Sequence, residues 1–230
     1  MKTLVLKIGG SLLYNDELVF NTEIVKKVEA WYEKQKEYDL VLFVVGGGKI
    51  SRFVVNQVKG DIKEEDFKHR IGMKMTQVNS AIFHGMLGNS DCKYFDSLKR
   101  LFKTVKKKKV RGAVIGGASV GGSTDMVAAN IAFELGVDTV HKISNISNVY
   151  CSDPKTNENA QPIEKLSWEE YAKLFKEVFE HGHQPGMNIP VDFRCASFCK
   201  KNEISFRICG GENLKKMEIG EVLKTGTIVG

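Results

Sequence analysis

Short apolar runs alternate along the chain with longer stretches in which apolar residues recur every three or four positions. The runs at 3–8 and 39–45 are almost continuously apolar, which is typical of parallel strands covered on both faces. Further strands are predicted at 110–115, 139–143, 204–208 and 227–229. The pattern therefore predicts a sheet of mainly parallel strands.

Helical spacing fills the segments between these runs. Asn21 can cap a helix whose apolar residues Ile24, Val28, Trp31 and Tyr32 share one face. A longer helix is predicted further on, with one buried stripe of apolar residues three or four positions apart. The stripe consists of Phe67, Ile71, Met75, Val78 and Ile82.

Helix boundaries are marked by capping residues in the second half of the chain. A helix at 124–135 is expected to end at Gly136. Ser167 and Glu170 form a capping box, and the helix that they open is expected to run toward His181 and to stop near Gly182. A further helix is predicted at 191–201.

Strands that alternate with helices indicate an α/β fold built on a mainly parallel sheet. The 230 residues contain no internal repeat or convincing linker, so we expect a single domain that spans 1–230. Ligands of such folds gather at the carboxyl ends of the strands.

The charge balance limits the choice of partner only weakly. Lys and Arg total 34 against 28 Asp and Glu, an excess that suits small anions as well as a polyanion. The basic run at 106–109, followed by Arg111, is interpreted as a solvated helix end, so we expect no nucleic-acid partner. No apolar stretch approaches the roughly 20 residues needed to cross a bilayer, and no membrane association is expected.

The five cysteines show no CxxC spacing, and their odd number disfavours a closed disulfide framework. We therefore expect a reducing, cytoplasmic location. Cys195 and Cys199, together with His181 and His183 nearby, are candidate ligands of a metal site. Structural zinc sites usually use closely spaced pairs of ligands such as C-x₂-C, and this chain has no C-x₂-C pair. We therefore expect no metal bound by the protein.

Three glycine clusters directly follow predicted strands. Glycine lets the backbone approach an anion, and the first N–H groups of a following helix are free to bind it. The sequence has no Walker A loop, no G-x-G-x-x-G opening a first helix and no protein-kinase signature set. The clusters are Gly9-Gly10-Ser11, Gly46-Gly47-Gly48-Lys49, and Gly116-Gly117 continuing to Gly121-Gly122-Ser123-Thr124-Asp125.

Cationic and hydroxyl groups accompany these turns, with one carboxylate among them. Phosphoryl transfer requires such a mixture, because charge develops on the phosphoryl oxygens and is stabilised by cations, amides and metal. The glycine turns therefore predict a phosphotransferase. The groups are Lys7, Ser11, Lys49, Arg52, Ser123, Thr124 and Asp125.

In these blocks the chain resembles the amino-acid kinase superfamily and, within it, the archaeal-type UMP kinases. A fourth block, Ser144-Asn145 through Val149-Tyr150 to Asp153-Pro154, extends the resemblance over essentially the whole chain. The resemblance implies a three-layer αβα sandwich, of the carbamate kinase-like type, that transfers the γ-phosphoryl group of Mg·ATP to UMP. It also implies a homo-oligomer, a hexamer built from dimers through the early helices.

The resemblance also implies roles for individual residues. Lys7 would neutralise the moving phosphoryl group, and Asp125 would orient the catalytic lysines. The ATP side would comprise Gly10, Ser11, Gly48, Arg52, Ser144, Asn145, Tyr150 and Asp153. The UMP side would comprise Gly47, His69, Ala118, Ser119, Val120, Gly121, Gly122, Ser123 and Thr124.

Some positions depart from the family pattern and leave the acceptor open. His69-Arg70 stands where the family usually has an aspartate, Ser147-Asn148 replaces Asp-Gly, and Ala118 replaces threonine. Lys49 and Arg52 favour a phosphate acceptor over a carboxylate. The histidine that isopentenyl-phosphate-type kinases place near this turn is missing between 41 and 53. A non-catalytic nucleotide-binding or storage protein on the same fold is a further alternative.

Overall fold

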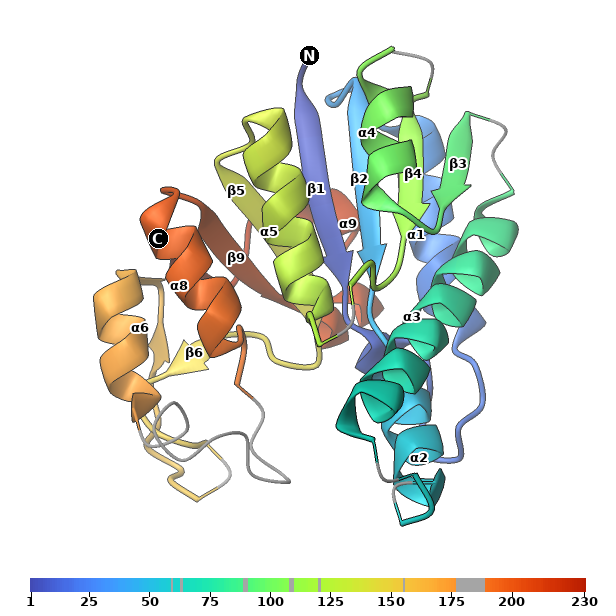
Figure 1. Cartoon of the computed structure of the whole chain (residues 1–230). Coiled ribbons are helices and arrows are strands. Elements are labelled where there is room, and N and C mark those ends of the chain that lie inside the picture. Colours follow the sequence, from blue (N-terminus) through green and yellow to red (C-terminus); the bar gives the residue numbers. More distant parts are fainter. Residues whose placement is uncertain are drawn as a thin grey trace.

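The computed structural model of the chain describes residues 1–58, 60–62, 64–88, 91–107, 110–119, 121–154, 156–176 and 189–230. Its central feature is a sheet of eight described strands in the order β3-β4-β2-β1-β5-β9-β10-β8 (Figure 1). Their bounds are β1 Thr3–Ile8, β2 Leu40–Val45, β3 Cys92–Phe95, β4 Gly112–Ile115, β5 Thr139–Ser144, β8 Lys165–Leu166, β9 Ser205–Gly210 and β10 Thr227–Val229.

The six strands from β3 to β9 in this order are all parallel to their neighbours. β10 pairs antiparallel with β9, and β8 then runs parallel to β10. A separate antiparallel pair is formed by β6 (Val149–Tyr150) and β7 (Pro162–Ile163). The prediction of a mainly parallel sheet is confirmed.

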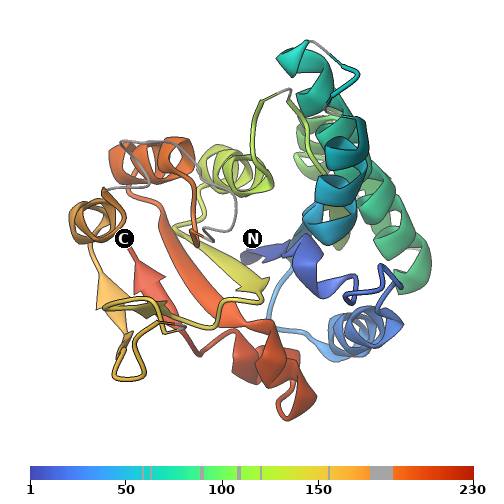
Figure 2. The ribbon, with the colours of Figure 1, turned by 90° about the horizontal axis from the view of Figure 1, so that it is seen from below.

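Helices cover both faces of the sheet, which gives the three layers of an αβα sandwich (Figures 1 and 2). One face is covered by α4 (Leu98–Val105), α5 (Thr124–Leu135), α6 (Trp168–Leu174) and α8 (Phe193–Lys201). The opposite face is covered by α1 (Thr22–Lys34), α3 (Glu65–Leu87) and α9 (Ile219–Val222). Three shorter or peripheral elements complete the described helices: η1 (Gly10–Leu12), α2 (Gly48–Val58) and η2 (Gly211–Lys215).

Local sequence signals set several of these boundaries as predicted. α5 ends at Gly136, which has a left-handed conformation with φ of 64°. The capping box of Ser167 and Glu170 opens α6. All six residues of β2 are buried, because both of its faces are covered by helices.

The predicted buried stripe of α3 is wrong. Phe67, Val78 and Ile82 are 50%, 48% and 39% exposed, and Ile71 and Met75 are only half-buried. The face turned to the protein instead carries Thr76, Asn79, Ser80, Phe83 and Leu87. Periodicity identified the helix, but polar contacts of its inner face with the backbone of the glycine turns set its rotation.

Other differences concern element ends and short elements. α6 ends at Leu174, earlier than predicted, and the segment toward His181, Gly182 and His183 lies outside the described residues. The short elements β3, α4, β6, β7, β8 and α9 were not predicted, because they span only two to eight residues each and offer little periodicity. Within the described ranges, no helix is both long and apolar enough to cross a membrane.

Thr227 links the main sheet to the small β6–β7 sheet, and its loss should destabilise the fold. Its buried Oγ1 donates to Ile163 O at 2.5 Å and accepts from Val149 N at 2.8 Å. Thr227→Val keeps the shape but leaves both backbone groups without this partner, so we expect a loss of about 2–4 kcal/mol in the free energy of unfolding, measured in urea. Thr225→Val is the control, since that hydroxyl bonds only within its own turn. Equal effects of the two substitutions would contradict the assignment.

Candidate active site

The turns that follow β1 and β2 touch each other through their backbones. A Cβ atom at Gly10 would lie 2.4 Å from Gly46 O. Gly48 has φ of +61°, and a Cβ atom there would lie 2.1 Å from the carbonyl carbon of Gly10. Only glycine fits at these two positions, so the glycines predicted to approach a ligand first allow the two turns to approach each other.

These touching turns carry free backbone donors. Among the described residues, the N–H groups of Gly10, Ser11, Gly47 and Gly48 have no hydrogen-bond acceptor, whereas the adjacent Gly9 N–H donates to Ile143 O at 2.7 Å. Gly10 and Gly48 begin η1 and α2, where the first N–H groups have no partner within the helix. Four N–H groups at the carboxyl ends of neighbouring parallel strands suit an anionic ligand.

Two further helices, α5 and α8, also begin at this edge of the sheet, and their caps are bonded together. Ser123 caps α5 by accepting from Met126 N at 3.0 Å, and its hydroxyl donates to Asp192 Oδ2 at 2.5 Å. Asp192 in turn caps α8 by accepting from Cys195 N at 3.1 Å. The positive ends of both helix dipoles therefore lie next to each other.

A buried cluster of three charged side chains lies at the base of these turns. Lys7 on β1 and Lys142 on β5 are paired in register, so both side chains leave the same face of the sheet. The Asp125 carboxylate, at the start of α5, lies 3.2 Å from Lys7 Nζ and 2.7 Å from Lys142 Nζ. All three residues are less than a tenth exposed.

Burial and neighbouring charges shift the pKa values of Lys7 and Asp125. Burial lowers the pKa of Lys7 to about 8; Asp125 partly offsets this lowering, and Lys142 adds a smaller one. Burial by itself would raise the pKa of Asp125, but Lys142 and Lys7 outweigh it and lower the pKa. At neutral pH the cluster therefore carries two ammonium groups and one carboxylate, a net positive charge in a site of low dielectric constant.

Lys142 was missed by the sequence reasoning. The available signal was a lysine within the strand predicted at 139–143, since a charge that is buried in a sheet needs a partner. Lys142 Nζ also donates to the backbone carbonyl of Pro190, just before α8. The lysine thus connects β5 to α5 and to the segment that precedes α8.

The residues predicted for the ATP side are only partly brought together. Ser11 Oγ donates to Asn145 Oδ1 at 3.1 Å, so the turn after β1 meets the segment after β5. Ser144 is buried against Gly9. Tyr150 is half-buried in β6, while Asp153 and Arg52 are exposed, the latter on α2.

The residues predicted for the UMP side lie mostly around the turn after β4. Gly122 N donates to Ser119 O at 3.3 Å, and Gly121 has φ of +72°. Thr124 Oγ1 is 3.5 Å from the place of a Cβ atom at Gly46, which brings this turn close to the one after β2. Gly47, Ala118 and Ser123 belong to these two turns, whereas His69 is exposed on α3. Val120 lies outside the described residues.

Cys195 and Cys199 are buried on α8 with their sulfur atoms 3.9 Å apart. Within the described residues, no group of three or more His, Cys, Asp or Glu side chains could hold a metal ion. His181 and His183, the other residues considered for such a site, lie outside that part of the chain.

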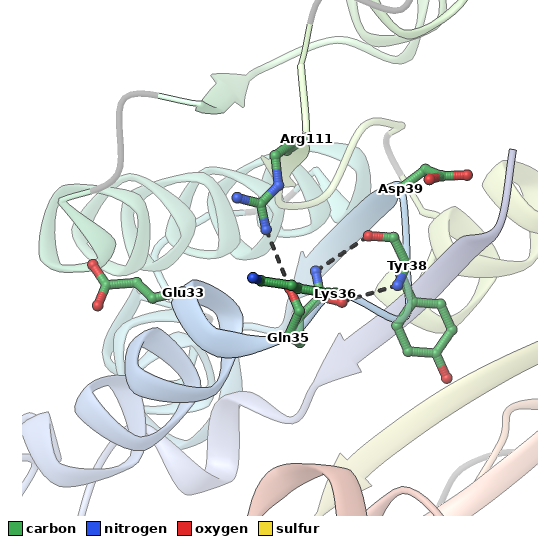
Figure 3. Close-up of a pocket in the computed structure, with 6 residues that line it drawn as sticks. All are labelled: Glu33, Gln35, Lys36, Tyr38, Asp39 and Arg111. Atoms are coloured by element: carbon green, nitrogen blue, oxygen red, sulfur yellow. Dashed lines mark hydrogen bonds between the residues drawn. The ribbon is translucent and has the colours of Figure 1, made fainter.

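A polar pocket of about 300 Å³ lies at the opposite edge of the sheet (Figure 3). Asp39 and Arg111 line it just before β2 and β4 begin, and Gln35 connects its sides by bonds with Tyr38 and Arg111. The pocket is thus at the amino ends of the strands, away from the glycine turns.

The model of the amino acid kinase family matches residues 2–210. The chain belongs to the amino acid kinase family. It is 30% identical over 215 residues to a uridylate kinase of Thermococcus sibiricus, covering 93% of this chain and 92% of that protein. A uridylate kinase of Thermococcus onnurineus is 28% identical over 230 residues, covering 98% of both chains.

The crystal structure of the uridylate kinase of Archaeoglobus fulgidus has a TM-score of 0.76 and 26% identity, and the match covers all of both chains. The match to the amino acid kinase family includes all three glycine turns and the charged cluster. The family resemblance read from the glycine blocks is therefore confirmed.

Replacing Asp125 by asparagine should leave two buried ammonium groups without their carboxylate. We expect Asp125→Asn to lower the free energy of unfolding by about 3–5 kcal/mol at pH 7. The folded-state pKa of Lys7, about 8, is below its unfolded value of 10.5, so the unfolded chain binds more protons and stability rises with pH above about 8.

The loss caused by Asp125→Asn should therefore be smaller at pH 9 than at pH 7, because Lys7 is mostly neutral in both proteins at the higher pH. Urea unfolding at the two pH values measures it. Asp192→Asn is a control that changes a helix-capping carboxylate at the same edge and should show no such dependence on pH. A loss independent of pH for Asp125→Asn would contradict the described cluster.

Proposed function

We propose that this chain transfers the γ-phosphoryl group of ATP to UMP, which gives UDP and ADP. The observation that carries the proposal is the buried Lys7–Asp125–Lys142 cluster beneath turns whose N–H groups are free. Its similarity to uridylate kinases over more than nine tenths of its length supports UMP as the acceptor.

The chain's own residues supply electrostatic stabilisation and alignment. The free N–H groups of the first two turns bind phosphate oxygens, and the ammonium groups of Lys7 and Lys142 neutralise charge on the phosphoryl group in transfer. Asp125 holds both lysines in place and favours the ammonium form of Lys7 by raising its pKa against the effect of burial. No general base is needed, since the attacking oxygen of UMP is already ionised at neutral pH.

Magnesium would enter with ATP, where it neutralises phosphate charge. It prefers phosphate oxygens and water, and usually needs only one or two protein carboxylates. Asp125 Oδ1 fits such an ion, because it is buried and, apart from the Lys7 ammonium group 3.2 Å away, has no hydrogen-bond donor among the described residues. We propose that this oxygen accepts from a metal-bound water.

The two nucleotides are assigned to different parts of the site. ATP lies along Gly10, Ser11 and Gly48, with Arg52, Ser144, Asn145, Tyr150 and Asp153 as further contacts. UMP lies along Gly47 and the turn at 118–124, with His69 beside it. We further propose that residues 1–230 act as one domain and that the enzyme works in the cytoplasm on these small molecules.

We also propose that the chain forms a homo-oligomer through α2 and α3. α2 and α3 lie at one flank of the molecule (Figure 1), and both helices carry exposed apolar residues. They are Phe53, Phe67, Val78 and Ile82. Burying them in a second copy would remove the cost of exposing the apolar stripe of α3. A hexamer is the assembly that resemblance to UMP kinases implies.

A coupled assay for ADP release tests the function. UMP should be consumed with Mg·ATP at least ten times faster than CMP, acetylglutamate or isopentenyl phosphate. Calorimetry with ATP and UMP runs alongside. Nucleotide binding without consumption of any acceptor would overturn the proposal and favour a storage or regulatory protein.

Two lysine substitutions in the same assay test the roles of the cluster. Lys7→Met and Lys142→Met should each lower kcat by about 10²–10³, the usual cost of removing one group that stabilises the transition state. Lys26→Met, on the exposed side of α1, should leave kcat unchanged. Activity near wild type in either cluster variant would refute its role.

Analytical ultracentrifugation tests the assembly. The double substitution Val78→Glu and Ile82→Glu should shift the protein to a smaller species, because charge would be buried in the contact. Val19→Glu changes another exposed apolar residue and serves as the control. A monomeric wild-type protein at micromolar concentration would overturn the assembly proposal.

A further inference from the structure

The inner face of α3 contacts the glycine turns through polar side chains. Thr76 Oγ1 accepts from Gly117 N at 2.5 Å, and Gln77 Nε2 donates to Gly117 O at 3.1 Å, so both backbone groups of that glycine are held. Asn79, which is fully buried, makes the corresponding contacts with the turn after β2. The helix is thus a common support for the turns after β2 and β4.

Asn79 determines which way two peptide groups of the turn face. Its Nδ2 donates to Gly46 O at 2.9 Å and to Gly47 O at 3.0 Å. In a planar trans peptide the N–H points opposite to the C=O. With both carbonyls fixed toward α3, the N–H groups of Gly47 and Gly48 must point away from α3. These are two of the four free donors of the site.

The other end of the Asn79 carboxamide is fixed by Tyr14. Tyr14 OH donates to Asn79 Oδ1 at 2.9 Å, and Tyr14 follows η1, the short helix that begins in the turn after β1. Flipping the carboxamide would place Oδ1 against two carbonyl oxygens and lose both of those bonds, even though Tyr14 OH could then accept from Nδ2. A single side chain therefore joins α3 to the segments after β1 and β2, and only one of its orientations satisfies all three bonds.

We propose that Asn79 is a positioning residue for phosphoryl transfer, which orients the Gly47 and Gly48 N–H groups toward the bound phosphates and ties their turn to the segment after β1. The inference rests on the proposed function, since it assigns those N–H groups to nucleotide phosphates. Asn79 itself touches no substrate. Its effect should appear in the binding of phosphate groups rather than in the amount of folded protein.

Asn79→Asp tests the role with almost no change of shape. The carboxylate can still accept from Tyr14, but it cannot donate to the two carbonyls. KM for ATP and for UMP should rise together by about tenfold to a hundredfold, as expected for donors that lose their orientation. Partial unfolding would instead lower the maximal rate and leave KM unchanged.

Two further variants complete the test. Tyr14→Phe removes only the bond to Oδ1 and should raise both KM values by a smaller factor, about threefold. Ser80→Ala is the matched control, because Ser80 is equally buried on α3 but bonds only to Gln77 O within the helix. Its KM values should equal those of the wild type.

Binding measurements separate this inference from the proposed function. If the wild-type chain binds ATP and UMP without turnover, the function fails, and the role of Asn79 is judged from the dissociation constants of the same variants. Asn79→Ala takes the place of Asn79→Asp if the latter does not fold, with the same expected rise. Wild-type KM and dissociation constants in whichever variant folds would overturn the inference.

Discussion

The site depends on the balance between one buried carboxylate and two buried ammonium groups. Lys7 and Lys142 lie side by side on neighbouring strands, and without Asp125 their mutual repulsion and burial would disfavour both charges. Asp125 offsets part of this cost, since the pKa of Lys7 is still lowered to about 8, and it leaves a net positive charge. That surplus is a preorganised electrostatic field for a group that gains negative charge at the same place.

Contacts between the turns explain why the rest of the fold is arranged around this cluster. The turns after β1 and β2 touch through Gly10 and Gly48, so neither can move alone. The polar face of α3 supports the turn after β2 and is joined to the segment after β1 through Tyr14, and this requirement overrides the apolar stripe of that helix. The apolar residues of α3 are therefore exposed because the opposite, polar face of the helix is needed to hold the turn.

Sequence patterns predicted the sheet, the main helices and the glycine turns, because these follow from local signals such as apolar runs and caps. Lys7 and Asp125 were identified through the turns that they flank. Lys142 and Asn79 were not identified. The role of a lysine in a strand, or of an asparagine in a helix, depends on contacts with residues that are distant in sequence. The rotation of α3 was mispredicted for the same reason.

The pairing of Lys7 with Lys142 also has a consequence for how the protein acquires its activity. These strands are separated by well over a hundred residues, and slipping either strand by one residue would turn its lysine to the opposite face. No fragment that contains only one of them can assemble the cluster. Activity should therefore appear late in folding, when the most distant pairing in the centre of the sheet has closed.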